Sequence, residues 1–388
     1  MQILIIGGTG VLSSAVTEVA IKKSIKITMI NRGNHSIPQN VELIKSDRKN
    51  FNFIKKSLQG KTFDAVMDFL CYSDNDTEES VRFYSNYTRQ YFFISSCAVY
   101  DTQKMGGRPC SEDDVKSLAI WDYSVNKWRS EQKVHLLFKN LDCKYTIIRP
   151  CVTYGNTRIP YGIDPRCRCH WTLIARILEG KPIIRWNGGN NRCNMTRVED
   201  FAVGVVGLIG NENAYNEAFN VCGEETPTWN DVLAIISKTI GKEIKTIDIP
   251  SEYYAKELPL RKGEILGGRS IDAIMDNSKI KSIVPEFRQT IYIEEGIQKT
   301  IEAYKQNNFE EGIDWKFDAD TDRIIAKWCK QNKIKISDLN LLFTDYLHTA
   351  RNKERIIYFM VRHKDMIIFR MIIKARFVIR RLMNILFH

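Results

Sequence analysis

A tyrosine and a lysine stand four residues apart, at Tyr123 and Lys127. On a helix, this spacing places both side chains on one face, so that the ammonium group lies beside the phenol. A phenol with a pKa of about 10 is a poor base at neutral pH, and a neighbouring positive charge lowers that pKa. The pair therefore predicts a tyrosine that takes a proton from a hydroxyl group, unless the two residues only form a solvated helix face.

A glycine-rich turn near the start of the chain predicts a site for phosphate groups. The apolar run from Ile3 to Ile6 leads into Gly7-Gly8-Thr9-Gly10, and a helical pattern follows as far as Ala20. Glycine lets such a turn approach a pyrophosphate, and the N-terminal end of the helix binds its charge. Taken alone, the pattern also fits a tight turn without a ligand. The predicted cofactor-binding residues of the turn are Gly7, Thr9, Gly10, Val11 and Leu12.

Strands and helices alternate through the first 150 residues. This alternation predicts an α/β fold, with a Rossmann-like, doubly wound parallel sheet over residues 1–150. Tyr123 and Lys127 would then lie on the helix that precedes the last of these strands. Apolar runs mark strands at residues 25–30, 65–69, 91–95 and 145–148, and helical patterns lie at 76–84 and 125–138.

The chain beyond residue 150 has a mixed pattern of Pro and Gly turns, short strands and helices. It predicts a smaller, mixed α/β substrate-binding lobe over residues 151–309, interleaved with the first domain. The acidic stretch 310–322, which contains Gly312, is typical of a linker. Residues 310–388 are therefore predicted to form a helical extension that ends in a basic amphipathic helix.

Several motifs follow one another in a set order: Phe93-Ile94-Ser95-Ser96, the Tyr123 and Lys127 pair, and Arg149-Pro150. Together with the glycine turn, this order resembles the extended short-chain dehydrogenase/reductase family, which includes NAD-dependent epimerases and dehydratases of sugar nucleotides. The resemblance extends over about residues 1 to 306. One departure is Ser13, which stands where the family has a third glycine and is small enough for close helix packing.

The resemblance implies a catalytic set of Ser96, Tyr123 and Lys127. Tyr123 would exchange a proton with a sugar hydroxyl, Ser96 would hold that oxygen, and Lys127 would also position the nicotinamide ribose. The implied activity is that of an NAD(P)-dependent sugar-nucleotide epimerase or 4-keto reductase in cell-surface glycan biosynthesis, and these residues do not separate the two reactions. Dehydration is disfavoured, because Cys97 and Ala98 follow Ser96 where the family's dehydratases carry an Asp-Glu pair.

The end of the second predicted strand favours NADP over NAD. Asn31 and Arg32 stand in place of the acidic residue that would bind the ribose 2′-hydroxyl, and Arg32 can pair with a 2′-phosphate. Arg32 also fits a turn residue that faces solvent. Asp47 matches the family position near the adenine, and a plain turn aspartate is the alternative.

Arginines of the second lobe are the candidates for substrate binding, because the resemblance implies a nucleotide diphosphate and guanidinium geometry matches phosphate. They are Arg185, Arg192, Arg261 and Arg269, of which Arg261 has the strongest claim, and each also fits an ordinary surface charge. No metal site is predicted, since the Cys167-x-Cys169-His170 cluster lacks a second pair of ligands.

The net charge of +11 is concentrated in residues 351–388, which carry ten Lys and Arg against two Asp and Glu. On a helical wheel, apolar residues such as Ile372 and Ile379 lie opposite basic ones such as Lys374 and Arg381. Such a helix is typical of an anionic membrane surface, unless its apolar face packs on the enzyme or on a twin subunit. A membrane position would admit a lipid-linked sugar as well as a nucleotide sugar.

The chain start lacks the pattern of a signal peptide, and no apolar run is long enough to span a bilayer. A cytoplasmic protein is therefore predicted, either free or peripheral on the membrane, and ten cysteines fit reduced thiols there. The resemblance implies a homodimer, and nucleic acid ranks behind the membrane as a partner of the tail. An alternative of another class is a non-catalytic dinucleotide-binding protein that recruits membrane partners or RNA through this tail.

Overall fold

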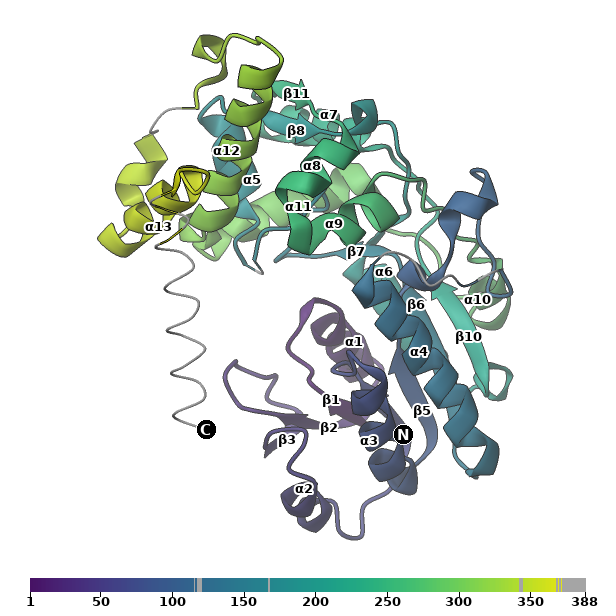
Figure 1. Ribbon diagram of the computed structural model, residues 1–388. Coiled ribbons are helices and arrows are strands. Elements are labelled where there is room, and N and C mark those ends of the chain that lie inside the picture. Colours follow the sequence, from purple (N-terminus) through teal and green to yellow (C-terminus); the bar gives the residue numbers. More distant parts are fainter. Residues whose placement is uncertain are drawn as a thin grey trace.

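The computed structural model describes residues 1–114, 116, 121–166, 168–341, 345–367, 369 and 371. Among these residues, seven parallel strands form a central sheet in the order β10-β6-β5-β4-β1-β2-β3 (Figure 1). The chain runs outward from β1 to β3 and then crosses to β4 on the other side of β1, which confirms the predicted doubly wound sheet. The strands are β1 (Gln2–Ile6), β2 (Lys26–Asn31), β3 (Val41–Lys45), β4 (Phe63–Asp68), β5 (Thr88–Ile94), β6 (Lys144–Pro150) and β10 (Glu217–Val221).

Helices cover both faces of this sheet, which is why its strands are continuous apolar runs rather than alternating ones. On one face, α1 (Val11–Lys22) and α6 (Val198–Gly207) pack through residues such as Val16 and Phe201. On the other face lie α2 (Phe51–Ser57), α3 (Asp74–Tyr84) and α4 (Asp122–Leu137), where Val81 and Val134 are fully buried. Both α6 and β10 come from the 151–309 range but complete the first lobe.

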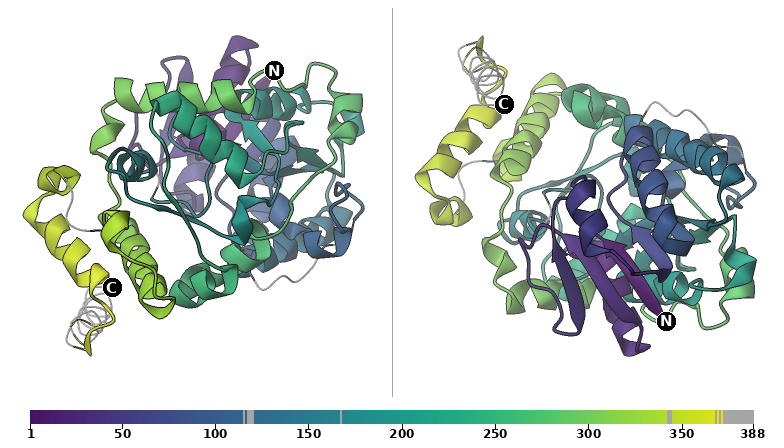
Figure 2. Two further views of the ribbon diagram at one scale, coloured as in Figure 1. Left: turned by 90° about the horizontal axis from the view of Figure 1, so that it is seen from above. Right: turned by 90° about the horizontal axis from the view of Figure 1, so that it is seen from below.

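The second lobe is built on two short parallel strand pairs, β7 with β9 and β8 with β11. It lies at the carboxyl edge of the central sheet, so that the strand ends face it (Figures 1 and 2). Its strands are β7 (Val152–Tyr154), β8 (Ile183–Arg185), β9 (Met195–Arg197) and β11 (Thr246–Asp248), and its helices are α5 (Trp171–Leu178), α7 (Trp229–Ile240), α8 (Ser251–Glu257), α9 (Lys262–Glu264) and α11 (Ile293–Gln306). Helix α10 (Ser278–Ile283) instead packs beside β10 on the first lobe, where Ile280 is buried in the same cluster as Phe219 (Figure 1).

The linker predicted at residues 310–322 is wrong, because most of that stretch belongs to helix α12 (Trp315–Gln331), which packs on the second lobe beside α5 (Figure 1). Asp318 and Asp322 of this helix are completely buried and pair with the buried bases Arg176 and Lys181. A run of acids in the sequence does not distinguish a solvated linker from a helix whose acids have buried partners.

The last described helix is α13 (Asn352–Arg362), which packs against α12. The predicted basic amphipathic helix falls largely on residues 368, 370 and 372–388, which lie outside the described part of the chain. Among the residues that the structure describes, no helix is both long and apolar enough to cross a bilayer.

Candidate active site

The structure brings Ser96, Tyr123 and Lys127 together beyond the end of β5. Ser96 lies just after that strand, and its Oγ accepts a hydrogen bond from the Ala98 N–H at 3.1 Å. Its hydroxyl is also hydrogen-bonded to the phenol of Tyr123, in the first turn of α4. Burial raises the pKa of Tyr123, whereas the bond with Ser96 and the charge of Arg158 act in the opposite direction. The phenol therefore needs a further positive charge nearby to ionise at neutral pH.

Lys127 is buried one helical turn further along α4. Its ammonium donates hydrogen bonds of 2.7 Å to the carbonyl oxygens of Cys71 and Ile94, and it lies 6.0 Å from the ring centre of Tyr123. Burial lowers the pKa of Lys127 from 10.5 to about 8. The lysine is thus held at the ends of β4 and β5 and remains mostly charged at pH 7.

A buried polar network fixes the helix that carries these two residues. Glu131, one turn beyond Lys127, accepts hydrogen bonds from the Ser95 hydroxyl and from the Arg149 guanidinium, whose Nη2 lies 2.7 Å from Oε2. Glu131 and Arg149 are both almost fully buried, and they come from α4 and β6. In addition, the Ser124 hydroxyl donates to the Ala98 carbonyl. Because these bonds join α4 to β5 and β6, they set the position of Tyr123 relative to Ser96.

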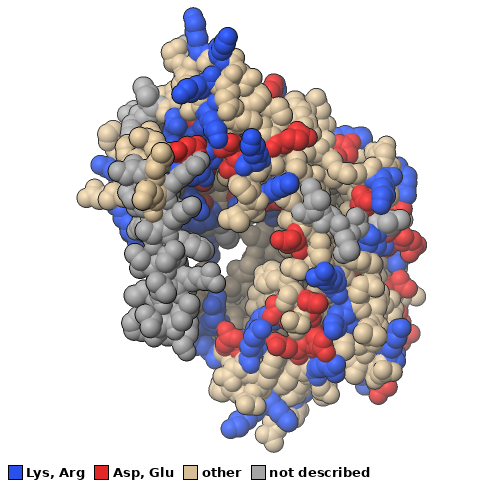
Figure 3. All heavy atoms as spheres, in the orientation of Figure 1, with Lys and Arg blue, Asp and Glu red and all other residues tan. Residues whose placement is uncertain are grey.

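Ser96 and Tyr123 line a cavity of about 390 Å³ between the two lobes. The second lobe contributes charged side chains to its wall, Arg158, Asp164 and Arg269 among them. Arg158 forms an ion pair with Asp164. The cavity is wide enough for a sugar with its phosphates, and Figure 3 shows the surface hollowed between the lobes.

Of the predicted substrate arginines, Arg269 lines this cavity. Its guanidinium lies 3.5 Å from Glu264 and 3.8 Å from Asp164, and its buried Nε has no hydrogen-bond partner among the described residues. The other predicted arginines are not among the lining residues. Arg185 pairs with Asp248 at 2.6 Å, Arg192 with Asp272 at 2.9 Å, and Arg261 with Glu264 at 2.8 Å.

The glycine turn has the backbone shape that a close phosphate contact needs. Gly7 and Gly8 have φ angles of +106° and +88°, and a Cβ at Gly8 would lie 2.3 Å from the Met29 side chain. In the first turn of α1, the N–H groups of Val11 and Leu12 have no hydrogen-bond partner among the described residues. Free donors at a helix N-terminus favour an anion, so the turn fits a dinucleotide pyrophosphate.

Two polar side chains brace this turn. Ser13 is buried, and its Oγ accepts a hydrogen bond of 2.9 Å from the Gly10 N–H, so that the serine closes the turn on itself. Asn31 donates from Nδ2 to the Gly7 carbonyl at 3.2 Å and accepts from the Gly33 N–H at 2.7 Å. Asn31 thereby holds the end of β2 against the glycine turn, so its position is explained without a ligand.

The remaining predicted cofactor residues lie on the surface. Thr9 faces a second cavity, of about 420 Å³, which also reaches the segment after β2. Arg32 is exposed and forms no ion pair with any described residue. Asp47 is also exposed, and its carboxylate accepts the Lys49 N–H at 2.9 Å, which is the geometry of a plain turn. Arg32 and Asp47 therefore both remain accessible to an adenosine.

The sequence patterns did not single out Asp68, at the end of β4. It is completely buried and accepts hydrogen bonds from the Leu70 N–H at 2.7 Å, the Ser80 hydroxyl and the Cys71 thiol. This aspartate shapes the turn whose Cys71 carbonyl holds Lys127. Its position could have identified it, because Asp68 ends β4, and ligands bind in such sheets between β4 and β1, where the strand order reverses.

Three cysteines also lie in the wall of the 390 Å³ cavity, Cys97, Cys151 and Cys193. A hydrogen bond from Cys97 lowers the pKa of the Cys151 thiol, while burial raises the pKa of Cys97. Among the described residues, no three His, Cys, Asp or Glu side chains are grouped to hold a metal ion. His170 instead accepts a hydrogen bond of 3.2 Å from the Ile159 N–H.

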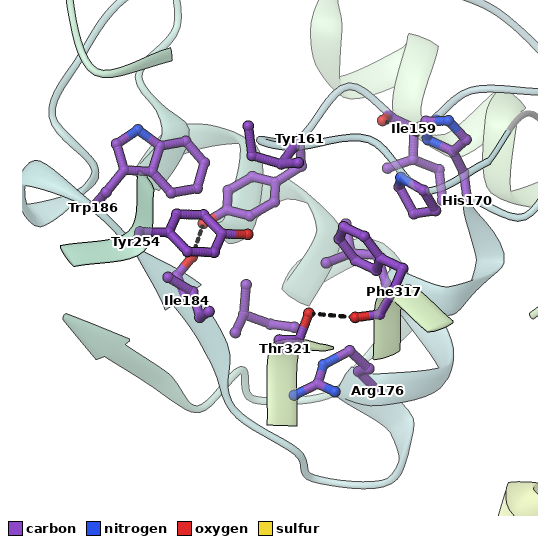
Figure 4. Close-up of a pocket in the computed structure, with 13 residues that line it drawn as sticks. Ile159, Tyr161, His170, Arg176, Ile184, Trp186, Tyr254, Phe317 and Thr321 are labelled. Carbon is purple, nitrogen blue, oxygen red and sulfur yellow. Dashed lines mark hydrogen bonds between the residues drawn. The ribbon is translucent and has the colours of Figure 1, made fainter. Parts of the chain in front are cut away.

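A smaller, largely apolar cavity of about 40 Å³ lies within the second lobe, beneath α12 (Figure 4). Tyr161, Trp186 and Tyr254 line it, and the Tyr161 hydroxyl donates to the Ile184 carbonyl at 3.1 Å. That volume admits a few water molecules and no sugar. It is therefore a packing defect of the core rather than a candidate substrate site.

Comparison with known proteins supports the family resemblance. Residues 79–222, which include Ser96, Tyr123 and Lys127, match the model of the NAD dependent epimerase/dehydratase family, so the resemblance predicted from the sequence is confirmed. The chain is 27% identical over 255 residues to the chloroplast stem-loop binding protein of 41 kDa b of Arabidopsis thaliana, covering 62% of this chain and 63% of that protein.

A second relative is an uncharacterized UDP-glucose epimerase of Bacillus subtilis, 22% identical over 153 residues, which cover 39% of this chain and 45% of the relative. The chain thus spans less than two thirds of the length of either relative. Among solved structures, UDP-glucuronic acid 4-epimerase of Bacillus cereus, in complex with UDP-glucuronic acid and NAD, matches with a TM-score of 0.64 at 19% identity. This match covers 79% of this chain and all of that one, and it establishes the same fold.

Proposed function

We propose that this chain, whose residues 79–222 match the NAD dependent epimerase/dehydratase family, is an NAD(P)-dependent sugar-nucleotide epimerase or 4-keto reductase of the extended short-chain dehydrogenase type. The observation that carries the proposal is the meeting of Ser96 and Tyr123 in the wall of a large cavity that also contains arginines, with the Lys127 ammonium buried beside the Tyr123 ring. That arrangement supplies a base, a hydrogen-bond donor and a cation around one reacting oxygen.

In the proposed reaction, Tyr123 as phenolate takes the proton of a sugar hydroxyl while the carbon that bears it is oxidised. A dinucleotide held at the glycine turn would supply the hydride acceptor for that carbon and, in an epimerase, the hydride donor for the return step. The Ser96 hydroxyl donates a hydrogen bond to the sugar oxygen, and the Lys127 ammonium stabilises the phenolate. Burial raises the pKa of Tyr123, and the Ser96 hydrogen bond and the charge of Arg158 oppose this. In this proposal, the ammonium of Lys127, 6.0 Å from the ring centre, adds a further positive charge that favours the phenolate.

The glycine turn is the proposed site of the cofactor's pyrophosphate, held by the N–H groups of Val11 and Leu12. Asp47 lies on the adenine side in this proposal. Arg32, which directly follows β2, is exposed and forms no ion pair with any described residue, which supports binding of a 2′-phosphate and so favours NADP.

The proposed substrate is a nucleotide sugar, whose diphosphate needs cations in the second lobe. Arg269, buried in the cavity wall with an unpartnered Nε, is best placed to bind it. Arg192 and Arg261 pair with Asp272 and Glu264 and, unlike Arg269, do not line the cavity, so they are weaker candidates. A related fold that binds UDP-glucuronic acid and NAD supports this substrate class.

Replacement of Tyr123 by phenylalanine tests the proposal. Removal of one positioned acid/base group slows turnover by about 10²- to 10⁴-fold, while dinucleotide binding should stay within about twofold. Conversion of UDP-glucose and UDP-glucuronic acid, followed by NMR, measures epimerisation, and consumption of NADPH with a 4-keto sugar nucleotide measures reduction. Tyr292→Phe, at a tyrosine that is 52% exposed, is the matched control. Equal turnover of the Tyr123→Phe variant and the control would contradict the proposal.

The basic C-terminal tail supports a second part of the proposal, a peripheral position on an anionic membrane in the service of glycan assembly. Residues 351–388 carry ten bases against two acids, and such a tail attracts anionic lipid. Sedimentation of the full chain with vesicles that contain phosphatidylserine, compared with neutral vesicles, tests this attraction. Association as a homodimer is proposed from the family resemblance, and light scattering measures it.

A second candidate function is a non-catalytic dinucleotide-binding protein with RNA as its partner. The observation in its favour is that one relative is named a stem-loop binding protein, and the basic tail supplies charge for phosphates. Under this candidate, the Tyr123→Phe variant and the wild type behave alike, and both retard an RNA hairpin in a gel shift at physiological salt.

A further inference from the structure

The 420 Å³ cavity beside the glycine turn receives a cationic side chain from the opposite lobe. Gly8 and Thr9 form one wall, and the His35–Pro38 segment after β2 forms another. The remaining charged wall residues are Glu18 of α1 and Arg168, which belongs to the segment between β7 and α5. Arg168 therefore reaches from the second lobe to the turn at which the cofactor is proposed to bind.

The backbone of Arg168 is held in an unusual conformation. Its φ angle is +64°, in the left-handed region that residues other than glycine rarely adopt. The start of the C-terminal extension packs closely against this backbone. A Cβ at Gly312 would lie only 2.4 Å from the Arg168 carbonyl oxygen. Asp314 also accepts the Arg166 N–H at 3.0 Å. Strain of this kind persists only where the surroundings impose it, and it is frequent at ligand-binding sites.

The guanidinium of Arg168 lies over the ring of Phe309, 5.7 Å from its centre. A cation over an aromatic face keeps its hydrogen-bonding edge free for another partner. Among the described residues, Arg168 forms no ion pair, although Glu18 shares the cavity wall, and the side chain is exposed. A positive charge without a carboxylate partner therefore faces the N-terminal end of α1, and both features favour an anionic ligand.

We propose that Arg168 binds a phosphate group of the dinucleotide, so that the second lobe contributes directly to the cofactor site. The proposal rests on the proposed function, because it takes a dinucleotide as the ligand. A guanidinium forms paired, charge-assisted hydrogen bonds with phosphate oxygens, and the facing wall contains Gly8 and Thr9, which directly precede the N-terminal end of α1. The two sources of phosphate are the pyrophosphate, common to both dinucleotides, and the 2′-phosphate of NADP.

The test compares the dissociation constants of NADH and NADPH for the full chain and its variants, measured by fluorescence of the reduced nicotinamide. Arg168→Gln removes the charge and should weaken binding about tenfold. Weaker binding of both dinucleotides assigns Arg168 to the pyrophosphate, and weaker binding of NADPH alone assigns it to the 2′-phosphate. The matched control is Arg166→Gln, an exposed arginine of the same segment that does not line the cavity, and its binding should change by less than twofold.

Arg168→Gly separates binding from folding. Glycine adopts a positive φ without strain, so this variant should melt at the same temperature as the wild type or higher, while it binds the dinucleotide about tenfold more weakly. Unchanged affinity of both variants, alongside wild-type protein that binds a dinucleotide, overturns the role of Arg168. Absence of dinucleotide binding by the wild type instead overturns the proposed function on which this role depends.

Discussion

Replacement of Asp322 by asparagine should strongly destabilise the protein, because Asp322 belongs to a buried network of ion pairs. The Asp322 carboxylate lies 2.7 Å from the guanidinium of Arg176 and 2.6 Å from the ammonium of Lys181, and it accepts the Tyr358 hydroxyl. With Asp318 it balances the two bases, and all four charged side chains are at most 1% exposed. The asparagine keeps the shape of the side chain but leaves one buried positive charge uncompensated.

The expected loss follows from that imbalance. Breaking a buried ion pair by removal of one partner costs about 3–5 kcal/mol, because the remaining charge stays out of water. Domains have a free energy of unfolding of about 5–15 kcal/mol, so this loss is a large share of the total. Asp248→Asn is the matched control, since Asp248 pairs with Arg185 but is 58% exposed. A surface pair of this kind contributes about 0–1 kcal/mol.

Equilibrium unfolding in urea, followed by circular dichroism and by tryptophan fluorescence, measures both variants. Trp315 at the start of α12 is buried, so its exposure when the extension is released contributes to the change in fluorescence. The Asp322→Asn midpoint should fall well below that of Asp248→Asn. A loss of less than about 1 kcal/mol would refute the reasoning, since it would show that the network does not hold α12 in place.

Three further outcomes are expected. Gly8→Ala should cost about 1–3 kcal/mol of stability and abolish dinucleotide binding, because its φ is +88° and its Cβ would overlap Met29; calorimetry of unfolding and of binding measures both. Lys127 has a pKa of about 8 in the folded protein against 10.5 when free. Between these two pH values, the unfolded chain holds the proton and the folded chain does not. The free energy of unfolding therefore rises with pH in this range, by at most about 1.4 kcal/mol per pH unit. Lys127→Met should lose this rise in urea titrations at several pH values, and an identical slope would contradict the burial of the charge. Iodoacetamide should label Cys151, whose thiol pKa is lowered, before it labels Cys97, whose thiol pKa is raised. A bound nucleotide sugar should slow this labelling, and mass spectrometry locates the label. Preferential reaction at Cys97 would contradict the expectation.

The features that the sequence predicted correctly depend on neighbouring residues. The apolar runs of β1, β4 and β5 are local, and so is the helical spacing of Tyr123 and Lys127, so each could be recognised before the fold was known. The glycine turn has the same character, because the positive φ of Gly8 and its proximity to Met29 arise within one unit of strand, turn, helix and the next strand. Short-range pattern and chain geometry were sufficient for these elements.

The features that the sequence did not reveal depend on contacts between distant segments. Arg158 and Arg269 meet at Asp164 in the cavity wall, although no spacing relates them along the chain. Conversely, Arg261 seemed a strong candidate by its sequence context, but it pairs with Glu264 and does not itself line the cavity. Charge in a sequence does not reveal its partner, and the partner decides whether an arginine is free to meet a substrate.

The place of β10 in the sheet has a consequence for the order in which the protein folds during synthesis. β6 pairs with β5 on one side and with β10 on the other, and β10 leaves the ribosome only after much of the second lobe has been translated. Until then, the backbone of β6 is an unpaired edge, with Ile147 and Ile148 beside it awaiting burial. A nascent chain in this state is exposed to association with its neighbours, so translation pauses before β10 (Glu217–Val221) has left the ribosome should increase aggregation, and later pauses should not.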